Sequence, residues 1–197
     1  MNKQIILASG SPRRKKLLQQ LGVEFEVRES NFEEDMSLKM SPKKLVQVLA
    51  MGKAESVAKE YLLSKKHKNT VIIAADTVVV FKNKILGKPK TPQRATAMLK
   101  SLSGQAHLVL TGLVVWDLSI SKKYSTTVVT KVVFRKLSKQ EITKYVNSKE
   151  PLDKAGAYAI QENAGVFVEK IYGDYNNIVG LPVAVLSKYL KALQVMK

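Results

Sequence analysis

The chain has 197 residues, of which 45% are hydrophobic and 25% are charged, as is usual for a globular protein with its own core. It contains no cysteine, which excludes a disulfide framework, a thiolate nucleophile and a zinc ribbon. The histidines are His67 and His107 alone, so any bound metal should be a hard cation held by carboxylates and phosphate oxygens. No run approaches the roughly 18 apolar residues of a membrane-spanning helix, and the N-terminus becomes polar too soon for a signal peptide. We therefore expect a cytoplasmic location and no membrane partner.

The net charge of +17 is the one unusual bulk property. Such an excess attracts polyanions, whether nucleic acid, anionic lipid or nucleotide. Much of it lies in scattered lysine pairs such as Lys15-Lys16 and Lys122-Lys123, which are typical of a solvated surface. The sequence has no long basic block and no aromatic residues interleaved with basic ones to stack bases. Nucleic acid is therefore an admissible partner but not the favoured one.

The first part of the chain alternates between predicted strands and helices. Gln4–Ser9 is short and apolar, like a buried strand, and Ser11-Pro12 then provides an N-cap and a first-turn proline for a helix that Gly22 ends. Val23–Val27 alternates apolar and charged residues, which predicts a strand with one wet face. Ser41-Pro42 repeats the start signal before a long helix with apolar residues at helical spacing.

The middle of the chain is rich in predicted strands. Val71–Phe81 is a nearly continuous apolar run interrupted by Asp76-Thr77, which indicates a central strand. Thr91–Leu102 has the same start signal and predicts another helix. Two long β-rich runs follow, Ala106–Ile120 and Tyr124–Arg135, which we expect to be antiparallel neighbours.

The last part of the chain is the least regular. Ser138–Glu141 is a capping box that opens a short helix. Pro151–Pro182 is rich in Gly, Asp, Asn and Tyr, with a few strand-like residues at Val166–Val168, and a segment this long without periodicity is usually functional. Val183–Val195 closes the chain as a helix. The predicted class is mixed α/β (α+β), without the strict alternation of a doubly wound fold.

The first candidate site is the junction Leu7–Arg14, where a strand passes through a Gly/Ser turn into a helix N-terminus. Free backbone N–H groups and the helix dipole favour an anion there. Arg13 and Arg14 in the first turn oppose the dipole, which makes sense if they face a polyphosphate, with the hydroxyl of Ser9 nearby. The alternative is a surface helix start with two solvated arginines.

The second candidate is Asp76, set in an apolar strand. An ionised carboxylate there is strongly disfavoured unless a cation or metal pairs with it. We therefore expect Asp76 to be a metal ligand, a general base or both; the alternative is a structural salt bridge with a lysine. Together with Asp76, the acidic loop Phe32–Asp35 can supply oxygen ligands for Mg²⁺ or Mn²⁺.

Weaker signals come from lysines and from one small-residue segment. Lys88 lies between Gly87 and Pro89 on a constrained backbone and can be aimed at a phosphate, as can Lys53 in the long helix; each alone would be solvated surface. Glu150–Gln161 has small residues that allow a ligand to approach the backbone closely, and the side-chain amide of Gln161 can read a base edge. No nucleophilic triad, GxxxxGK[ST] loop or GxGxxG motif is present.

Taken together, these segments resemble the Maf family, also called septum-formation-inhibitor or Maf-like nucleotide pyrophosphatases. The resemblance covers nearly the whole chain, with the family's blocks in order. These blocks are Leu7-Ala8-Ser9-Gly10-Ser11-Pro12-Arg13-Arg14, Ala75-Asp76-Thr77, Gly87-Lys88-Pro89, Met98-Leu99-Lys100-Ser101-Leu102-Ser103-Gly104, Glu150–Gln161 and Val179-Gly180-Leu181-Pro182.

The resemblance implies one domain over residues 1–197, with a long twisted mixed sheet, flanking helices and two lobes around a cleft, similar to the inosine-triphosphate pyrophosphatase fold. It also implies a homodimer that hydrolyses nucleoside triphosphates to the monophosphate and pyrophosphate with Mg²⁺ or Mn²⁺.

The resemblance also implies roles for individual residues. The catalytic aspartate is Asp76, which shares the metal with Glu34. The residues that bind phosphate are Ser9, Arg13, Arg14, Lys53 and Lys88. The positions tied to base choice, Arg13, Thr77 and Gln161, fit the branch that prefers dTTP and UTP better than the branch that acts on 7-methyl-GTP.

Two other functions stay open at the level of sequence. One is a basic nucleic-acid-binding or cell-division regulatory protein without catalysis, which would bind DNA in a salt-sensitive way without metal. The other is a house-cleaning hydrolase for modified nucleotides that merely accepts dTTP or UTP.

Overall fold

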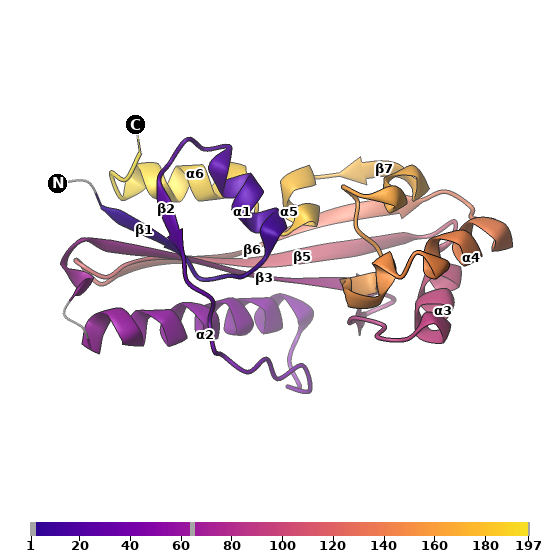
Figure 1. The fold of residues 1–197 in the computed structure, drawn as a ribbon, viewed down its shortest axis with the longest axis horizontal. Coiled ribbons are helices and arrows are strands. Elements are labelled where there is room, and N and C mark those ends of the chain that lie inside the picture. The colour runs from indigo at the N-terminus through magenta and orange to yellow at the C-terminus, as the bar shows by residue number, and fades with distance from the viewer. Residues whose placement is uncertain (1–2, 64–65, 197) are drawn as a thin grey trace. The chain divides into compact units, whose positions relative to one another are not determined.

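The computed structural model describes residues 3–63 and 66–196, drawn in Figure 1. The strands are β1 (Gln4–Leu7), β2 (Phe25–Val27), β3 (Thr70–Phe81), β4 (Lys84–Leu86), β5 (Ala106–Asp117), β6 (Lys122–Phe134) and β7 (Val168–Tyr172). The α-helices are α1 (Pro12–Gln19), α2 (Pro42–Leu63), α3 (Pro92–Leu102), α4 (Lys139–Asn147), α5 (Tyr175–Val179) and α6 (Val183–Ala192). The 3₁₀ helices are η1 (Lys66–Asn69), η2 (Glu150–Asp153), η3 (Ala155–Ala157) and η4 (Asn163–Phe167).

The strands form one mixed sheet in the order β2-β1-β3-β5-β6-β7, with β4 paired to β3. β1 runs parallel to β2 and to β3, whereas β4 is antiparallel to β3 and β7 is antiparallel to β6. The mixed α/β prediction is therefore confirmed. Among the described residues, no helix combines the length and apolar character needed to cross a bilayer.

The chain divides into two compact units. The first takes its described residues from Met1–Asp76, Thr111–Val128 and Gly180–Lys197, and the second consists of Thr77–Leu110 and Val129–Val179.

In the first unit, α2 packs along one side of the strands, and Figure 1 shows α1 and α6 on the other side. The apolar residues predicted on one face of α2 are buried, and those from Ala50 to Tyr61 join Ile6, Ile72 and Val114 in one core cluster. Helix and sheet approach each other closely at Gly112 of β5. A Cβ atom there would lie 2.1 Å from the carbonyl oxygen of Val46 in α2, so only glycine fits without a shift.

In this unit a partly buried lysine near the start of the described chain forms a salt bridge with β5 and a hydrogen bond with the segment after α6. Lys3 Nζ donates to Asp117 Oδ2 at 2.5 Å and to the Leu193 carbonyl oxygen at 2.9 Å. Burial raises the pKa of Asp117, but the hydrogen bonds from Lys3 and Ser119 more than offset this effect and leave that pKa below its ordinary value.

The second unit has an aromatic core. Phe134 lies edge-on to His107 and to Tyr158, with ring centroids 4.9 Å apart in both cases. Asn177 is fully buried and donates to the Val109 carbonyl oxygen at 3.1 Å and to Thr130 Oγ1 at 2.9 Å. These bonds tie α5 to β5 and β6.

Sequence patterns missed two parts of this unit. β4 was not predicted, although Lys82 and Asn83 have the positive φ angles (47° and 62°) of a tight hairpin turn. The segment predicted as irregular, Pro151–Pro182, contains short 3₁₀ helices, β7 and α5, and its strand begins at Val168 rather than spanning 166–168. Elements this short bury too few residues to produce a clear period.

Candidate active site

The turn after β1 is built around two serines. Ser11 caps α1 as predicted, because its side chain accepts from Arg14 N. Ser9 is buried, and its Oγ accepts from Ser11 N at 3.3 Å and from Arg14 Nη1 at 3.1 Å. The predicted strand–turn–helix junction is thereby confirmed.

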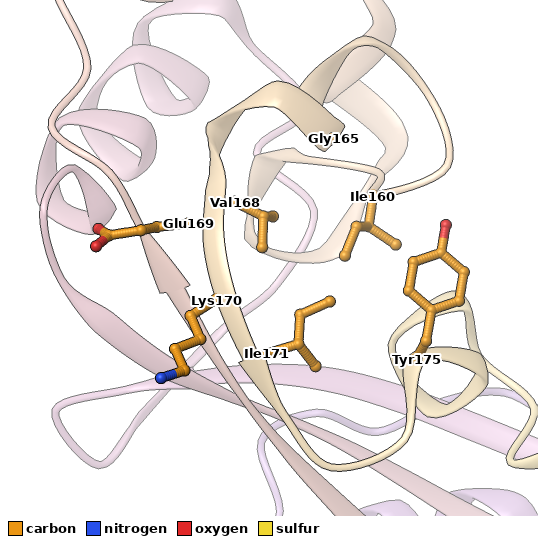
Figure 2. Close-up of a pocket in the computed structure, with 7 residues that line it drawn as sticks. All are labelled: Ile160, Gly165, Val168, Glu169, Lys170, Ile171 and Tyr175. Atoms are coloured by element: carbon orange, nitrogen blue, oxygen red, sulfur yellow. The ribbon is translucent and has the colours of Figure 1, made fainter.

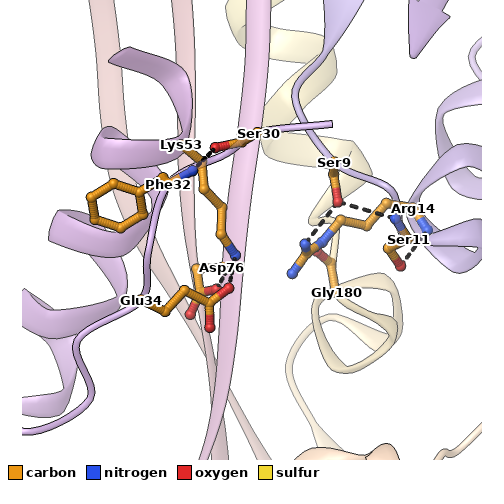
Figure 3. A network of polar contacts seen from close by, with 9 residues as sticks. All are labelled: Ser9, Ser11, Arg14, Ser30, Phe32, Glu34, Lys53, Asp76 and Gly180. Atoms are coloured by element: carbon orange, nitrogen blue, oxygen red, sulfur yellow. Dashed lines mark hydrogen bonds and ion pairs between the residues drawn. The ribbon is translucent and has the colours of Figure 1, made fainter. Parts of the chain in front are cut away.

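Arg14 is held from two sides, as Figure 3 shows. Besides its bond to Ser9, it donates from Nε to the Gly180 carbonyl oxygen at 2.8 Å. Burial lowers the pKa of Arg14 most, the Asp76 carboxylate acts in the opposite direction, Arg13 lowers the pKa and Glu34 raises it. Arg14 is thus not the solvated side chain of the alternative interpretation, and the two acids lie close enough to act on it. The anchor at Gly180 was not predicted, although that residue lies in one of the recognised blocks.

Asp76, near the middle of β3, shares a lysine with a second acid. Its side chain is buried, with the residue 5% exposed, and its Oδ1 accepts from Lys53 Nζ at 2.5 Å. The same ammonium lies 2.6 Å from Glu34 Oε1. The alternative interpretation of Asp76 required a lysine partner, and Lys53 is that partner. Because Glu34 also contacts Lys53, the site is not a simple ion pair: two carboxylates and one ammonium together carry a net charge of −1.

Within the acidic loop, Glu34 and Asp35 have different surroundings. Asp35 Oδ1 accepts from the backbone N and from the Oγ of Ser37, at 2.8 and 2.6 Å. These two bonds hold the pKa of Asp35 below its ordinary value. Asp35 therefore shapes the loop, whereas Glu34 contacts the lysine beside Asp76.

The two carboxylates that share Lys53 suit a hard divalent cation. Among the described residues, no group of three or more His, Cys, Asp and Glu side chains could hold an ion by itself. Mg²⁺ characteristically takes one or two protein carboxylates and completes its shell with water and substrate phosphates. Asp76 Oδ1 and Glu34 Oε1 both face one point that a cationic nitrogen now occupies, so the donor set fits such an ion.

The other predicted site residues belong to the second unit. Thr77 directly follows Asp76 in β3 and is half-buried, whereas Lys88 and Gln161 are exposed. The two blocks that carry Lys88 and Gln161 lie side by side, because Gly156 N donates to the Gly87 carbonyl oxygen at 3.1 Å and Lys90 N donates to the Leu152 carbonyl oxygen at 3.0 Å.

A buried His–Tyr pair next to these blocks was not predicted. His107 Nε2 lies 2.7 Å from the hydroxyl oxygen of Tyr158. Burial lowers the pKa of His107 to about 4 and raises the pKa of Tyr158. Both groups are neutral near pH 7, so the pair is a packing element of the segment that ends at Gln161. An isolated histidine in an apolar run gives no sequence signal for such a partner.

The second unit also has an open pocket of about 330 Å³. It is lined by Ile160, Gly165, Val168, Glu169, Lys170, Ile171 and Tyr175. Figure 2 shows Ile160, Ile171 and Tyr175 with their side chains grouped together. The predicted site residues are not among its lining.

Comparison with known proteins identifies the family to which the chain belongs. The family model described as Maf-like protein matches residues 4–193, and the chain belongs to this family. The "dTTP/UTP pyrophosphatase" of Alkaliphilus metalliredigens is 48% identical, over 94% of this chain and 94% of that protein. The "dTTP/UTP pyrophosphatase" of Methanosarcina barkeri is also 48% identical, over 96% of this chain and 93% of that protein.

A solved structure supports the fold. The Staphylococcus aureus Ham1 protein superposes with a TM-score of 0.54 and covers 97% of this chain and 100% of its own. The sequence identity is 12%, so the likeness concerns the fold alone. It agrees with the predicted mixed sheet with flanking helices.

Proposed function

We propose that this chain is a nucleoside triphosphate pyrophosphatase that hydrolyses dTTP and UTP to the monophosphate and pyrophosphate. The observation that carries the proposal is the buried Asp76, which shares Lys53 with Glu34 and lies near the anchored Arg14. Relatives of similar length and 48% identity bear the name of this activity.

The reaction replaces one bond to the α-phosphorus by another. The oxygen of a water molecule attacks that phosphorus, the bond to the oxygen bridging the α- and β-phosphates breaks, and pyrophosphate leaves with that oxygen. Asp76 takes the proton that the water loses. Its position inside β3 fixes the carboxylate relative to the phosphate, which is the positioning that phosphoryl-type transfer requires.

The cations of the site balance the charge of the substrate. A fully ionised triphosphate carries about four negative charges, and we assign its phosphates to Arg13, Arg14, Lys53 and Lys88, with Ser9 holding Arg14 in place. Arg14 is oriented before substrate arrives by its bonds to Ser9 and Gly180. Such preorganised donors stabilise charge that develops on the leaving group.

Asp76 and Glu34 would hold the Mg²⁺ or Mn²⁺ of this enzyme. When bound, that ion neutralises phosphate charge and makes a coordinated water more acidic. Lys53, which contacts both carboxylates in this structure, would bind a phosphate of the nucleotide, in the role that the family resemblance implies.

Base choice is assigned to Arg13, Thr77 and Gln161. The carboxamide of Gln161 offers an acceptor oxygen and a donor NH₂ group, which complement the N3–H and carbonyl edge shared by thymine and uracil. Gln161→Ala should therefore reduce the preference for dTTP and UTP over purine nucleotides. Unchanged ratios of kcat/KM across a nucleotide panel would contradict this role.

The experiment that tests the proposal is pyrophosphate release from a nucleotide panel with Mg²⁺ or Mn²⁺, repeated with EDTA. Asp76→Asn should lower kcat by at least about 10³-fold while the thermal unfolding curve stays cooperative. Full activity in this variant would remove Asp76 from the mechanism. A panel that favours modified nucleotides would instead identify a house-cleaning hydrolase, and metal-free, salt-sensitive DNA binding without hydrolysis would indicate a non-catalytic protein.

Two further parts of the proposal concern the setting of the enzyme. We assign it to the cytoplasm, where nucleoside triphosphates and Mg²⁺ are abundant, and we expect a homodimer. Light scattering on purified protein checks the second point, because a dimer would have about twice the 21.9 kDa mass of the chain.

A further inference from the structure

A glycine inside α2 marks a specific contact. Gly52 lies in the middle of a 22-residue helix, where glycine is disfavoured relative to alanine. A Cβ atom at this position would lie 2.3 Å from Cε2, 2.4 Å from Cζ and 2.7 Å from Cδ2 of Phe32. The aromatic ring therefore occupies the space that any larger residue would fill.

Phe32 belongs to the loop that brings Glu34 to the site. The loop between Val27 and Pro42 has no regular secondary structure, and most of its residues are exposed. Phe32 is half-buried, and its backbone N donates to Ser30 Oγ at 3.0 Å. The ring thus attaches an otherwise exposed segment to α2 (Figure 3).

Two neighbouring contacts join this loop to α2. Phe32 lies on Gly52, and two residues further along the loop Glu34 Oε1 lies 2.6 Å from Nζ of Lys53, the residue that follows Gly52. A flexible, exposed carboxylate gains little from a single ion pair. The ring contact reduces the number of positions that this carboxylate can adopt.

We propose that Phe32 and Gly52 form an aromatic anchor that positions Glu34 against Lys53 and Asp76. Both are positioning residues that act through Glu34. The anchor itself is a property of the fold, whereas its effect on catalysis rests on the proposed function.

The test uses Gly52→Ala, Phe32→Ala and the double variant of the full chain. Alanine favours the helix, so the clash should displace the ring and the loop rather than unfold α2. Native trypsin digestion reports on the loop through cleavage after the exposed Lys39. We expect faster cleavage in both single variants, by about tenfold, and no further increase in the double variant, because both changes remove one contact.

Mn²⁺ binding without nucleotide reports on the carboxylates. Displacement of Glu34 should raise the Mn²⁺ dissociation constant about tenfold, because one of two protein ligands no longer reaches the ion. The kcat/KM at limiting Mn²⁺ should fall by a similar factor and recover at saturating Mn²⁺. Lys59→Ala, exposed on α2, and Met36→Ala, exposed on the same loop, serve as matched controls and should resemble wild type.

The outcomes separate the two proposals. Wild-type cleavage and Mn²⁺ affinity in Gly52→Ala, or additive effects in the double variant, would overturn the anchor. If wild type fails to hydrolyse any nucleotide while cleavage after Lys39 and Mn²⁺ affinity change as expected, the anchor holds and the proposed function fails.

Discussion

Lys53 contacts two carboxylates, and its side chain is largely buried, with 12% exposed. Replacing it by methionine keeps the length of the side chain but leaves Asp76 and Glu34 facing each other without their shared cation. Breaking such a pair is expected to lower the free energy of unfolding by about 3 kcal/mol in metal-free protein. Chemical denaturation with EDTA present measures this effect.

The same substitution should strengthen metal binding. Without the competing ammonium, the site offers a divalent cation two negative charges, so we expect Lys53→Met to bind Mn²⁺ about tenfold more tightly, a difference of about 1.4 kcal/mol. Lys59→Met on the same helix is the matched control. Equal stability and equal Mn²⁺ affinity in the two variants would show that Lys53 does not compete with metal.

His107 gives a pH prediction at the same scale. Its folded pKa of about 4 lies below the ordinary value of 6.5, so the unfolded chain takes up a proton between these values that the folded protein does not. The stabilisation from neutral His107 is complete above pH 6.5 and is lost as the pH falls through about 4. Between about pH 7.5 and about pH 5 the loss should be about 2 kcal/mol.

Urea unfolding of wild type and His107→Phe at both pH values isolates this contribution. The variant also carries Tyr158→Phe, so that no buried hydroxyl is left without its partner. On acidification its free energy of unfolding should fall by about 2 kcal/mol less than that of wild type. The same pH dependence in both proteins would contradict a neutral, buried imidazole.

Sequence patterns indicated candidate residues for the site, but they did not indicate the contacts between those residues. Asp76 stood out because a carboxylate interrupts an apolar run, and the capping role of Ser11 follows from local chemistry. The pairing of Asp76 with Lys53 depends on how α2 packs on the sheet, across 23 positions of sequence. No local pattern contains that information. Likewise, the Gly180 carbonyl oxygen accepts a hydrogen bond from Arg14, which lies 166 positions away in the sequence.

At the scale of elements, the contact of α2 with β5 at Gly112 should tolerate no side chain. Gly112→Ala places a Cβ atom against the backbone of Val46, and backbone in a packed helix moves less easily than the end of a side chain. We expect a loss of about 2–3 kcal/mol, measured by denaturant unfolding. Gly87→Ala, where an added Cβ meets nothing within 4 Å, should change stability by less than about 0.5 kcal/mol.

Elements were predictable where start and stop signals are strong. Three helices begin where Ser or Thr precedes Pro, at Pro12, Pro42 and Pro92, and Gly22 and Gly104 follow two of their ends with positive φ. β7 was indicated only at Val168, its first residue, and the 3₁₀ turns around it were missed, because each is stabilised by tertiary contacts rather than by its own periodicity. One such contact is the bond from Arg135 N to the Phe167 carbonyl oxygen.

For the whole molecule, the net charge of +17 should affect the capture of an anionic substrate. Raising NaCl from about 50 to about 300 mM shortens the Debye length and should lower kcat/KM for dTTP several-fold, mainly through KM. Steady-state kinetics at constant free Mg²⁺ measure this dependence. A kcat/KM that does not change with salt would limit the surface charge to a role in solubility.

The salt bridge of Lys3 also has a topological consequence. Because its ammonium reaches both Asp117 and the Leu193 carbonyl oxygen, the first and last described segments lie within one side-chain length of each other. A short Gly/Ser linker could close the polypeptide into a ring, and the ring could be cut at the exposed hairpin turn of Lys82 and Asn83. Such a circular permutant would keep every strand pairing of the sheet while starting and ending in a different place.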